Sequence, residues 1–388
     1  MKKHDWMLWG FTLLCMAVAC SCHPESDTKR SDTLCTIPLK LKTETSPIRL
    51  SEVADSIRYI PLETSDSCLV GSVDKMLRTA QGEYILVDKE KSRAIYVFDA
   101  AGHFLNRIGK CGKGPAEYSM IEDVTYGFDN VYVWDNVQDK ILKYHTDGTW
   151  ITSFPFRCTA YSFCCLGKDR FAFGCDYARN PSFYQEGHYP NVVFYDAMNH
   201  QTQPYLYFDE KVNIAAYTLT LNNLTQSTLR LPLNDTLYAV NSDGVFPLVL
   251  LQYDEKLKQQ KQAYLASTRA ETLTAVEANQ ALQAGSFPQL ISYSSSQEVS
   301  LLFLRMGSYL YFGFFYPHSG TYLEGAAAGA FPVENDMDGS FFFIPLYQDG
   351  NRAYCLIDPS RLPDGHRCSL PLDIEDNPVI AEVYLKVK

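Results

Sequence analysis

Two stretches of this sequence repeat one pattern: GEYILVDKEKSRAIYVFDAAGHFLNRIG at residues 82–109, and DNVYVWDNVQDKILKYHTDGTWITSFP at residues 129–155. The matched pairs, each 46 residues apart, are Ile95 with Ile141, Val97 with Lys143, Phe98 with Tyr144, Gly102 with Gly148 and Phe104 with Trp150. Asp88 and Asp135 also match, with one residue gained between the copies. A period of about 45 residues, built from short strands and glycine turns, is typical of the four-stranded blade of a β-propeller. The repeat predicts the architecture but leaves the function open.

Length and composition agree with a single all-β unit. The chain has 388 residues, of which 46% are hydrophobic and 13% aromatic, and aromatic residues favour strands. All-β propellers use this length as one domain. The net charge of −11 argues against a nucleic-acid partner, because phosphate binding needs a concentrated basic face.

The N-terminus predicts export. Lys2 and Lys3 precede an apolar run at residues 6–19, which is too short to span a bilayer comfortably and reads as a signal peptide over residues 1–19. The sequence Ala-Val-Ala-Cys at residues 17–20 resembles a bacterial lipobox, in which the cysteine is acylated. This resemblance makes Cys20 the lipid attachment site, with Cys22 as the alternative, and residues 20–47 a lipidated flexible tether. An ordinary secretory peptide cleaved nearby is the competing interpretation.

A glycine-rich loop separates the two copies. Residues 107–126 read RIGKCGKGPAEYSMIEDVTY, and the loop contains the spacing G-x-x-G-x-GP-x-EY. Together with VYVWD and Gly148 this loop looks like an NHL-type repeat, and it is similar to the NHL-like six-bladed propeller lipoproteins of Bacteroidetes. The close resemblance covers residues 58–160. It implies a six-bladed fold and a cell-envelope location, lipid-anchored to the outer membrane, and no assigned activity.

The same loop is a candidate binding surface. It lacks the Lys-Ser/Thr ending and the following helix of a phosphate-binding loop, so a phosphate cradle is not expected. Its glycines suit a crossover between blades that needs positive φ. In that position Lys110, Lys113, Glu117 and Tyr118 would be displayed at a face of the propeller and could contact a ligand.

Asp88 and Asp135 end equivalent strands. Their repetition predicts a structural role in each blade, in which the side-chain oxygens bind the backbone of the following turn. The alternative is a ring of carboxylates that lines the central channel and binds a cation.

A third blade is expected over residues 161–208, with an inserted loop, YARNPSFYQEGHYPN, at residues 177–191. Tyr184 and His188 of this loop are candidate ligand contacts, because exposed aromatics beside polar groups suit stacking on sugar or peptide groups. The alternative is a long loop packed on its own aromatic side chains.

The remaining blades follow from strand and turn patterns, and the propeller is expected over residues 48–388. Residues 48–61 are expected to supply an outer strand that pairs with the C-terminal VIAEVYLKV, so that the last sheet edge is closed. Residues 255–285 have helical spacing and predict one helical insertion, which is an inert packing element, a lid or a partner surface. The cysteines lack zinc-site spacing; buried thiols are expected, with Cys355–Cys368 as one candidate disulfide.

Two functional hypotheses remain at this point. The first is a non-catalytic binding or protein-interaction module of the cell envelope, a monomer whose partner is an envelope protein or glycan and which touches the membrane through its lipid alone. The second is a glycan- or peptide-acting lyase or hydrolase with its site at the propeller channel. No catalytic motif, metal site or cofactor site is evident in the sequence.

Overall fold

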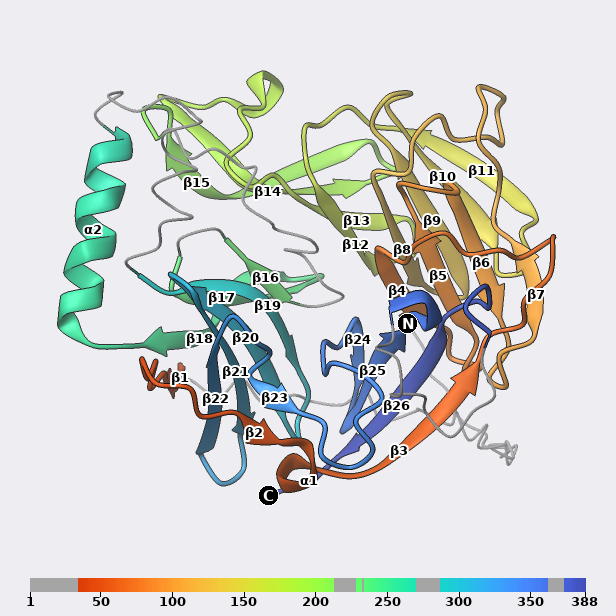
Figure 1. The fold of residues 1–388 in the computed structure, drawn as a ribbon. Coiled ribbons are helices and arrows are strands. Elements are labelled where there is room, and N and C mark those ends of the chain that lie inside the picture. The colour runs from red at the N-terminus through yellow and green to blue at the C-terminus, as the bar shows by residue number, and fades with distance from the viewer. Residues whose placement is uncertain (1–33, 213–227, 232–233, 270–286, 362–372) are drawn as a thin grey trace, which may run out of the picture. The chain divides into compact units, whose positions relative to one another are not determined.

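Six four-stranded sheets and one two-stranded sheet occur in the part of the chain that the structure describes. A computed structural model describes residues 34–212, 228–231, 234–269, 287–361 and 373–388, and Cys35–Lys388 form one structural unit. Within this unit the six sheets follow one another around a common centre (Figure 1). The prediction of a six-bladed β-propeller with four-stranded antiparallel blades is confirmed.

The repeated pattern forms the first two blades. The middle strands of blade 1 are buried along their whole length and those of blade 2 over most of theirs, because each blade packs between two others and both faces of the sheet are covered. The strands of blade 1 are β4 (Lys75–Arg78), β5 (Tyr84–Asp88), β6 (Ala94–Phe98) and β7 (Phe104–Arg107). Those of blade 2 are β8 (Asp123–Gly127), β9 (Asn130–Asp135), β10 (Lys140–His145) and β11 (Trp150–Pro155).

Blade 3 has the predicted extent. Its strands are β12 (Ser162–Gly167), β13 (Arg170–Gly174), β14 (His188–Asp196) and β15 (Gln201–Asp209). The inserted loop between β13 and β14 contains a short 3-10 helix, η1 (Pro181–Phe183).

Blade 4 takes one strand from the N-terminal segment. It contains β16 (Thr228–Arg230), β17 (Thr236–Asn241) and β18 (Gly244–Gln252), and β1 (Cys35–Pro38) adds to β18 as a parallel strand. The folded unit therefore begins at Cys35, earlier than the start at residue 48 that the sequence suggested.

Blades 5 and 6 complete the ring. Blade 5 consists of β19 (Gln289–Ser295), β20 (Ser300–Met306), β21 (Tyr309–Tyr316) and β22 (Thr321–Ala328). Blade 6 consists of β24 (Tyr347–Asp349), β25 (Arg352–Ile357), β26 (Val379–Leu385) and β3 (Ala54–Pro61). β3 pairs antiparallel with β26, so the predicted closure by the N-terminal segment is confirmed.

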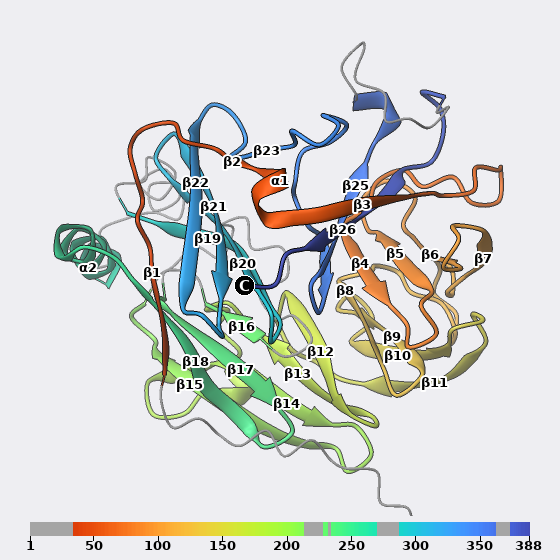
Figure 2. The same ribbon diagram turned by 90° about the horizontal axis from the view of Figure 1, so that it is seen from below.

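The N-terminal segment runs past blades 4 and 5 before it closes the ring in blade 6 (Figure 2). After β1 on blade 4, Ser46 bridges to Ala326 of blade 5, and β2 (Ile48–Arg49) pairs with β23 (Val333–Glu334). A one-turn helix, α1 (Leu50–Val53), then leads into β3 of blade 6. Another short 3-10 helix, η2 (Pro359–Arg361), follows β25.

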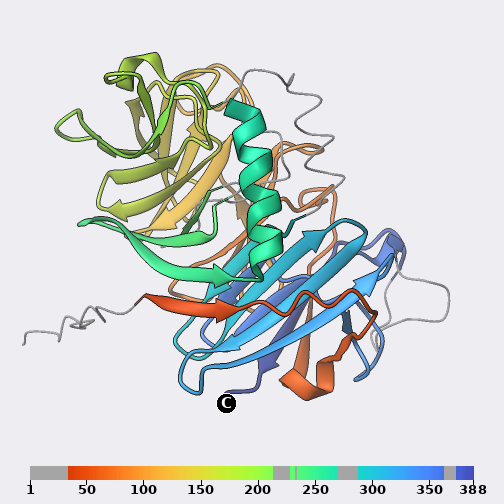
Figure 3. The same cartoon turned by 90° about the vertical axis from the view of Figure 1, so that its left-hand side faces the viewer.

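The predicted helix is present as α2 (Glu255–Arg269), which follows β18 (Figure 3). The rest of the predicted insertion lies outside the described residues. No helix in the described part of the chain is long and apolar enough to cross a membrane.

The inner strands define two faces of the propeller. The inner strand of a blade contacts the inner strand of the next blade, as in the pairs β24–β4, β4–β8 and β8–β12. Each of these strands starts at one face of the propeller and ends at the other. We call the face where they start the entry face and the face where they end the exit face. Crossover loops between blades therefore lie at the entry face, and the first turn of each of these blades lies at the exit face.

Candidate functional site

The glycine loop at residues 109–118 is held together by its own glutamate. Glu117 accepts a hydrogen bond from the Gly114 N–H at 2.9 Å and pairs with Lys110 Nζ at 3.1 Å. A Cβ atom at Gly112 would lie 2.0 Å from a Glu117 carboxylate oxygen, so a larger residue there would displace the Glu117 side chain from this position. The Gly114 N–H and the Lys110 ammonium lower the pKa of Glu117. The predicted crossover between blades is confirmed, because the loop joins β7 to β8.

Tyr118 is not displayed at the surface. Its side chain is buried among apolar residues of blades 1 and 2, and its hydroxyl donates to the carbonyl oxygens of Arg93 and Ile108 at 3.4 Å each. The expected display of Tyr118 is wrong, since this ring fills the junction between the two blades. Lys110 and Lys113 are exposed as expected, and their ligand-binding role stays a prediction.

The inserted loop of blade 3 packs largely on its own aromatic rings. Tyr184 lies 5.0 Å from Tyr189 between ring centroids, and its hydroxyl donates to Glu210 at 2.8 Å. His188 is exposed, with Nδ1 2.9 Å from the carbonyl oxygen of Glu186. These contacts agree with a self-packed loop, and ligand binding by Tyr184 and His188 stays a prediction.

Asp88 and Asp135 bind backbone rather than a cation. Asp88 is fully buried and accepts hydrogen bonds from four backbone N–H groups and two hydroxyls, belonging to Gly71, Ser72, Lys91 and Ser92. Asp135 accepts from the N–H groups of Ser119, Val137 and Gln138. The predicted turn role is confirmed. No group of three or more His, Cys, Asp or Glu residues that could hold a metal ion occurs among the described residues.

A pocket of about 580 Å³ lies at the exit face, where the inner strands of four blades meet. We call it the arginine pocket. It is lined by Arg78, Thr79, Ala80, Gln81, Gly82, Thr125, Tyr126, Gly127, Cys165, Tyr347, Asp349 and Arg352. Its two guanidinium groups come from the end of β4 in blade 1 and the start of β25 in blade 6.

Arg78 is fixed against two tyrosine rings. Its guanidinium carbon lies 5.3 Å from the ring centroids of both Tyr84 and Tyr354, a distance at which a cation is attracted to an aromatic face. One terminal nitrogen donates to the Tyr354 hydroxyl at 2.7 Å. Nε of Arg78 is buried and has no hydrogen-bond partner among the described residues. The guanidinium is held in place with donor capacity left over.

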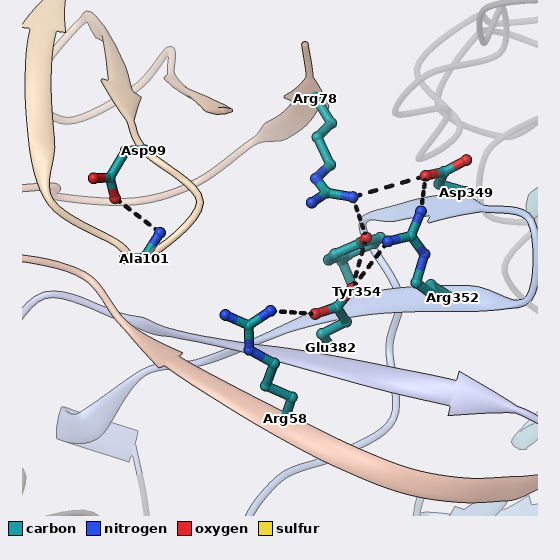
Figure 4. Close-up of polar contacts among 8 residues, drawn as sticks. All are labelled: Arg58, Arg78, Asp99, Ala101, Asp349, Arg352, Tyr354 and Glu382. Atoms are coloured by element: carbon teal, nitrogen blue, oxygen red, sulfur yellow. Dashed lines mark hydrogen bonds and ion pairs between the residues drawn. The ribbon is translucent and has the colours of Figure 1, made fainter. Parts of the chain in front are cut away.

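Behind the pocket, Tyr354 and Glu382 extend this network (Figure 4). The Tyr354 hydroxyl donates to Glu382 at 3.0 Å, and the same carboxylate lies 3.5 Å from Arg352 and 3.6 Å from Arg58. Glu382 is buried, so these cations offset the cost of removing its charge from water. Burial, and then the Glu382 charge, raise the pKa of Tyr354, which therefore stays a neutral donor.

Asp349 is the exposed carboxylate of the site. It contacts Arg352 and lies 3.7 Å from Arg78, and 45% of its side chain is exposed. Burial opposes the charge of Arg352, but Tyr354, Asp349 and Glu382 outweigh burial and raise its pKa. The arginine cluster, Arg58, Arg78 and Arg352 with Asp349 and Glu382, thus sets three guanidinium groups against two carboxylates.

The opposite wall of the pocket carries different chemistry. Tyr126 donates to Asp129 at 3.2 Å, and burial, with Asp129 and Glu83 nearby, raises its pKa. Burial raises the pKa of Cys165 to about 11, so its thiol is protonated and unreactive at neutral pH. The anion-binding capacity of the pocket therefore lies on its Arg78 and Arg352 side.

Sequence reasoning did not find the arginine cluster. The strand register sets Glu382 opposite both Tyr354 of β25 and Arg58 of β3, but that signal appears only once the ring closure is known. The residues singled out from the sequence lie at the entry face, since the 109–118 loop precedes β8 and the inserted loop of blade 3 follows β13. The pocket is at the other end of the same strands.

Comparison with known proteins identifies the family. The model described as "Domain of unknown function (DUF4934)" matches residues 34–384, and no curated protein matches. A crystal structure of a "Putative exported protein" from Bacteroides fragilis NCTC 9343 is similar, with a TM-score of 0.69 and 16% identity over 91% of this chain and 100% of that one. A DUF4221 family member from Bacteroides vulgatus has a TM-score of 0.48 and 10% identity over 87% and 98%. Because the family match spans most of its length, the chain belongs to the DUF4934 family.

Proposed function

We propose that this protein is an exported binding module that captures a carboxylate-bearing ligand in the arginine pocket. The observation that carries the proposal is that two guanidinium groups, those of Arg78 and Arg352, line the pocket together with one carboxylate, that of Asp349, within a chain whose net charge is −11. An anionic ligand is attracted to such a local positive site, and guanidinium groups match carboxylates through paired hydrogen bonds.

The arrangement of the donors supports a ligand role for Arg78. The two tyrosine rings fix its guanidinium, so little conformational entropy is lost when it binds. Arg78 lines the pocket, and about 15% of its side chain is exposed there. Arg352 is one-third exposed and adds a second guanidinium in the same pocket.

The chemistry of the residues that line the arginine pocket favours binding over catalysis. General acid–base catalysis works best with a group whose pKa lies near neutrality. The shifted groups that line the pocket, Tyr126, Cys165 and Arg352, all have pKa values raised away from neutrality. A lyase or hydrolase acting at the channel is therefore the weaker candidate.

The location that we propose is the cell envelope. The signal-peptide pattern of residues 1–19 and the lipobox-like Cys20, with Cys22 as the alternative, favour lipid attachment, with the propeller joined to the outer membrane by a tether. The name of the similar Bacteroides fragilis protein, which describes export, agrees with this location. The NHL-like resemblance of the 109–118 loop agrees too. Labelling with a palmitate analogue in wild type, Cys20→Ala and Cys22→Ala tests it, and an unlabelled wild type would contradict lipidation.

The exposed Lys110, Lys113, Tyr184 and His188 form a second candidate surface at the entry face, for an envelope protein or glycan. We rank it below the pocket, because its residues come from two separate loops, the crossover from blade 1 to blade 2 and the insertion of blade 3. The affinities of variants at these four positions measure how much this second surface contributes to ligand binding.

Titration calorimetry tests the pocket. The purified propeller is titrated with glucuronate and with glucose as the neutral counterpart, and in a second arm with N-acetylglutamate and N-acetylglutamine. We expect binding of one or both acids and none of the neutral compounds. Arg352→Gln and Arg78→Gln should each weaken that binding by about 10–100-fold, since a charged hydrogen bond contributes about 1.5–3 kcal/mol. Arg157→Gln serves as the control, because it removes an exposed guanidinium that does not line the pocket. Equal affinities for acid and neutral probes would refute the proposal.

A further inference from the structure

Two buried cysteines meet where the chain crosses from blade 2 to blade 3. Cys158 lies between β11 and β12, and Cys175 directly follows β13. Their sulfur atoms are 3.9 Å apart, and both side chains belong to the buried core of these blades. A disulfide bond needs sulfur atoms about 1.9 Å closer than this, a change within the reach of side-chain rotation.

The backbone on both sides of the pair is clamped. Asn180, which is itself buried, accepts from the Thr159 N–H at 2.7 Å and donates to the Thr159 carbonyl oxygen at 2.9 Å. The Tyr161 N–H donates to Gly174, and the Cys175 N–H donates to Asn191. The two segments are therefore held side by side by bonds that do not involve the sulfur atoms.

We infer that Cys158 and Cys175 form a disulfide bond in the mature protein, closing the crossover from blade 2 onto blade 3. The inference rests on the export part of the proposed function, because disulfides form and persist in oxidising compartments. It does not depend on the ligand of the arginine pocket.

The reaction is a thiol–disulfide exchange. The two cysteine thiols lose two protons and two electrons, and an Sγ–Sγ bond forms between them. The oxidant is a disulfide-bearing partner, a thiol–disulfide oxidoreductase in the envelope or oxidised glutathione in a test tube. Its own S–S bond breaks and it leaves as two thiols.

The bond is expected to form during folding rather than afterwards. Attack on a disulfide needs a thiolate. In the folded protein the contact with Cys158, together with burial, raises the pKa of Cys175 well above its usual value. The Cys175 thiol is therefore reactive before this segment of the core closes and protected once it has closed.

Alkylation under denaturing conditions, followed by peptide mass mapping, tests the inference in two arms. In the first arm, purified protein is refolded in a buffer of oxidised and reduced glutathione, and we expect a Cys158–Cys175 peptide pair and no alkylation at either position. In the second arm, protein is taken from the envelope without reductant, and its N-terminus shows whether the signal segment was removed. If the signal segment has been removed but both thiols are alkylated, the disulfide inference is overturned and the proposed export stands. Unprocessed protein counts against export, and the refolding arm then decides the disulfide by itself.

Thermal unfolding provides a second readout. Reductant should lower the Tm of oxidised wild type by about 3–6 °C, since the bond closes a loop of similar length to the 15-residue loops that give about 3 kcal/mol. The double variant Cys158→Ala/Cys175→Ala should show no reductant effect. Cys355→Ala, which changes another buried thiol, should keep the full effect. A reductant effect that survives in the double variant overturns the inference.

Discussion

Asp88 is the side chain whose removal gives the sharpest prediction for stability. It is fully buried at the end of β5 and accepts six hydrogen bonds, with distances from 2.7 to 3.1 Å. The donors belong to two segments, residues 71–72 before β4 and residues 91–92 before β6. Asp88 therefore ties the start of blade 1 to the turn between its middle strands.

Asp88→Ala removes all six bonds. Each hydrogen bond to a charged group contributes about 1.5–3 kcal/mol when its donor is buried. The donor residues here are exposed or half-buried, so water replaces part of that loss, and the two hydroxyls can turn to other acceptors. We therefore expect the free energy of unfolding to fall by about 3–5 kcal/mol, well below the simple sum.

Urea unfolding followed by tryptophan fluorescence measures this change. Asp99→Ala is the matched control, because Asp99 also accepts backbone N–H bonds, from Ala101 and His103, but at an exposed hairpin turn. It should cost about 1 kcal/mol or less. If Asp88→Ala costs no more than Asp99→Ala, the structural role that we assign to the repeated aspartate is wrong.

Three further predictions follow from particular contacts. Burial alone would raise the pKa of Asp88, but hydrogen bonds from Ser92, Lys91 and Ser72 outweigh burial and lower this pKa below 3.8. The stabilisation by Asp88 is therefore present above about pH 4 and is lost as the pH falls through the lowered pKa of the folded protein. Acid unfolding of Asp88→Asn should accordingly show a shallower pH dependence than that of wild type. Gly102→Ala should lower the free energy of unfolding by about 2–4 kcal/mol, because φ is +93° and the new Cβ would lie 2.2 Å from the Pro61 carbonyl oxygen. The control, Gly320→Ala, has φ +65° and no neighbour within 4 Å, and should cost about 1 kcal/mol. Similar melting temperatures for the two variants would argue against close packing of the β6–β7 hairpin on β3. Asp349→Asn should raise the affinity for a carboxylate probe by about 3–10-fold, since it removes the carboxylate that competes for Arg352 and Arg78. The control, Asp99→Asn, removes a carboxylate that does not contact the arginines (Figure 4). An equal gain in affinity for Asp99→Asn would mean that the change in net charge alone explains the effect.

The architecture could be predicted because its signals are local. Alternating or continuous apolar runs and glycine turns lie within single blades, and the matched aspartates lie within blades 1 and 2, so one pass along the chain finds them. Closure by β3 followed from the apolar alternation of residues 54–61 and the need to cover a sheet edge. β1 was missed because four residues that include Pro38 carry little strand signal, and because their partner β18 lies more than two hundred residues away.

The candidate site could not be predicted for a related reason. Arg58, Arg78, Asp349, Arg352 and Glu382 sit on strands from both ends of the sequence, and their proximity is a consequence of ring closure. The loops that drew attention in the sequence carry many polar residues in a short span, which marks them as exposed. Exposure alone does not say which face of a propeller holds a pocket. Here the loops lie at the face opposite to the arginine pocket, although His188 of the inserted loop lines another pocket, of about 670 Å³.

The most direct test of the account is nuclear magnetic resonance of the arginine side chains during titration with glucuronate. We predict that the Nε–H signal of Arg78 shifts progressively as glucuronate is added, because this N–H belongs to a guanidinium that lines the pocket. The signal of the exposed Arg157 should stay unchanged, as should both signals when glucose replaces glucuronate. If N-acetylglutamate and not glucuronate is the acid bound in the calorimetry, it takes the place of glucuronate, with N-acetylglutamine as the neutral probe. An Arg78 signal that does not move while the acid binds would contradict the assignment of the arginine pocket as the ligand site.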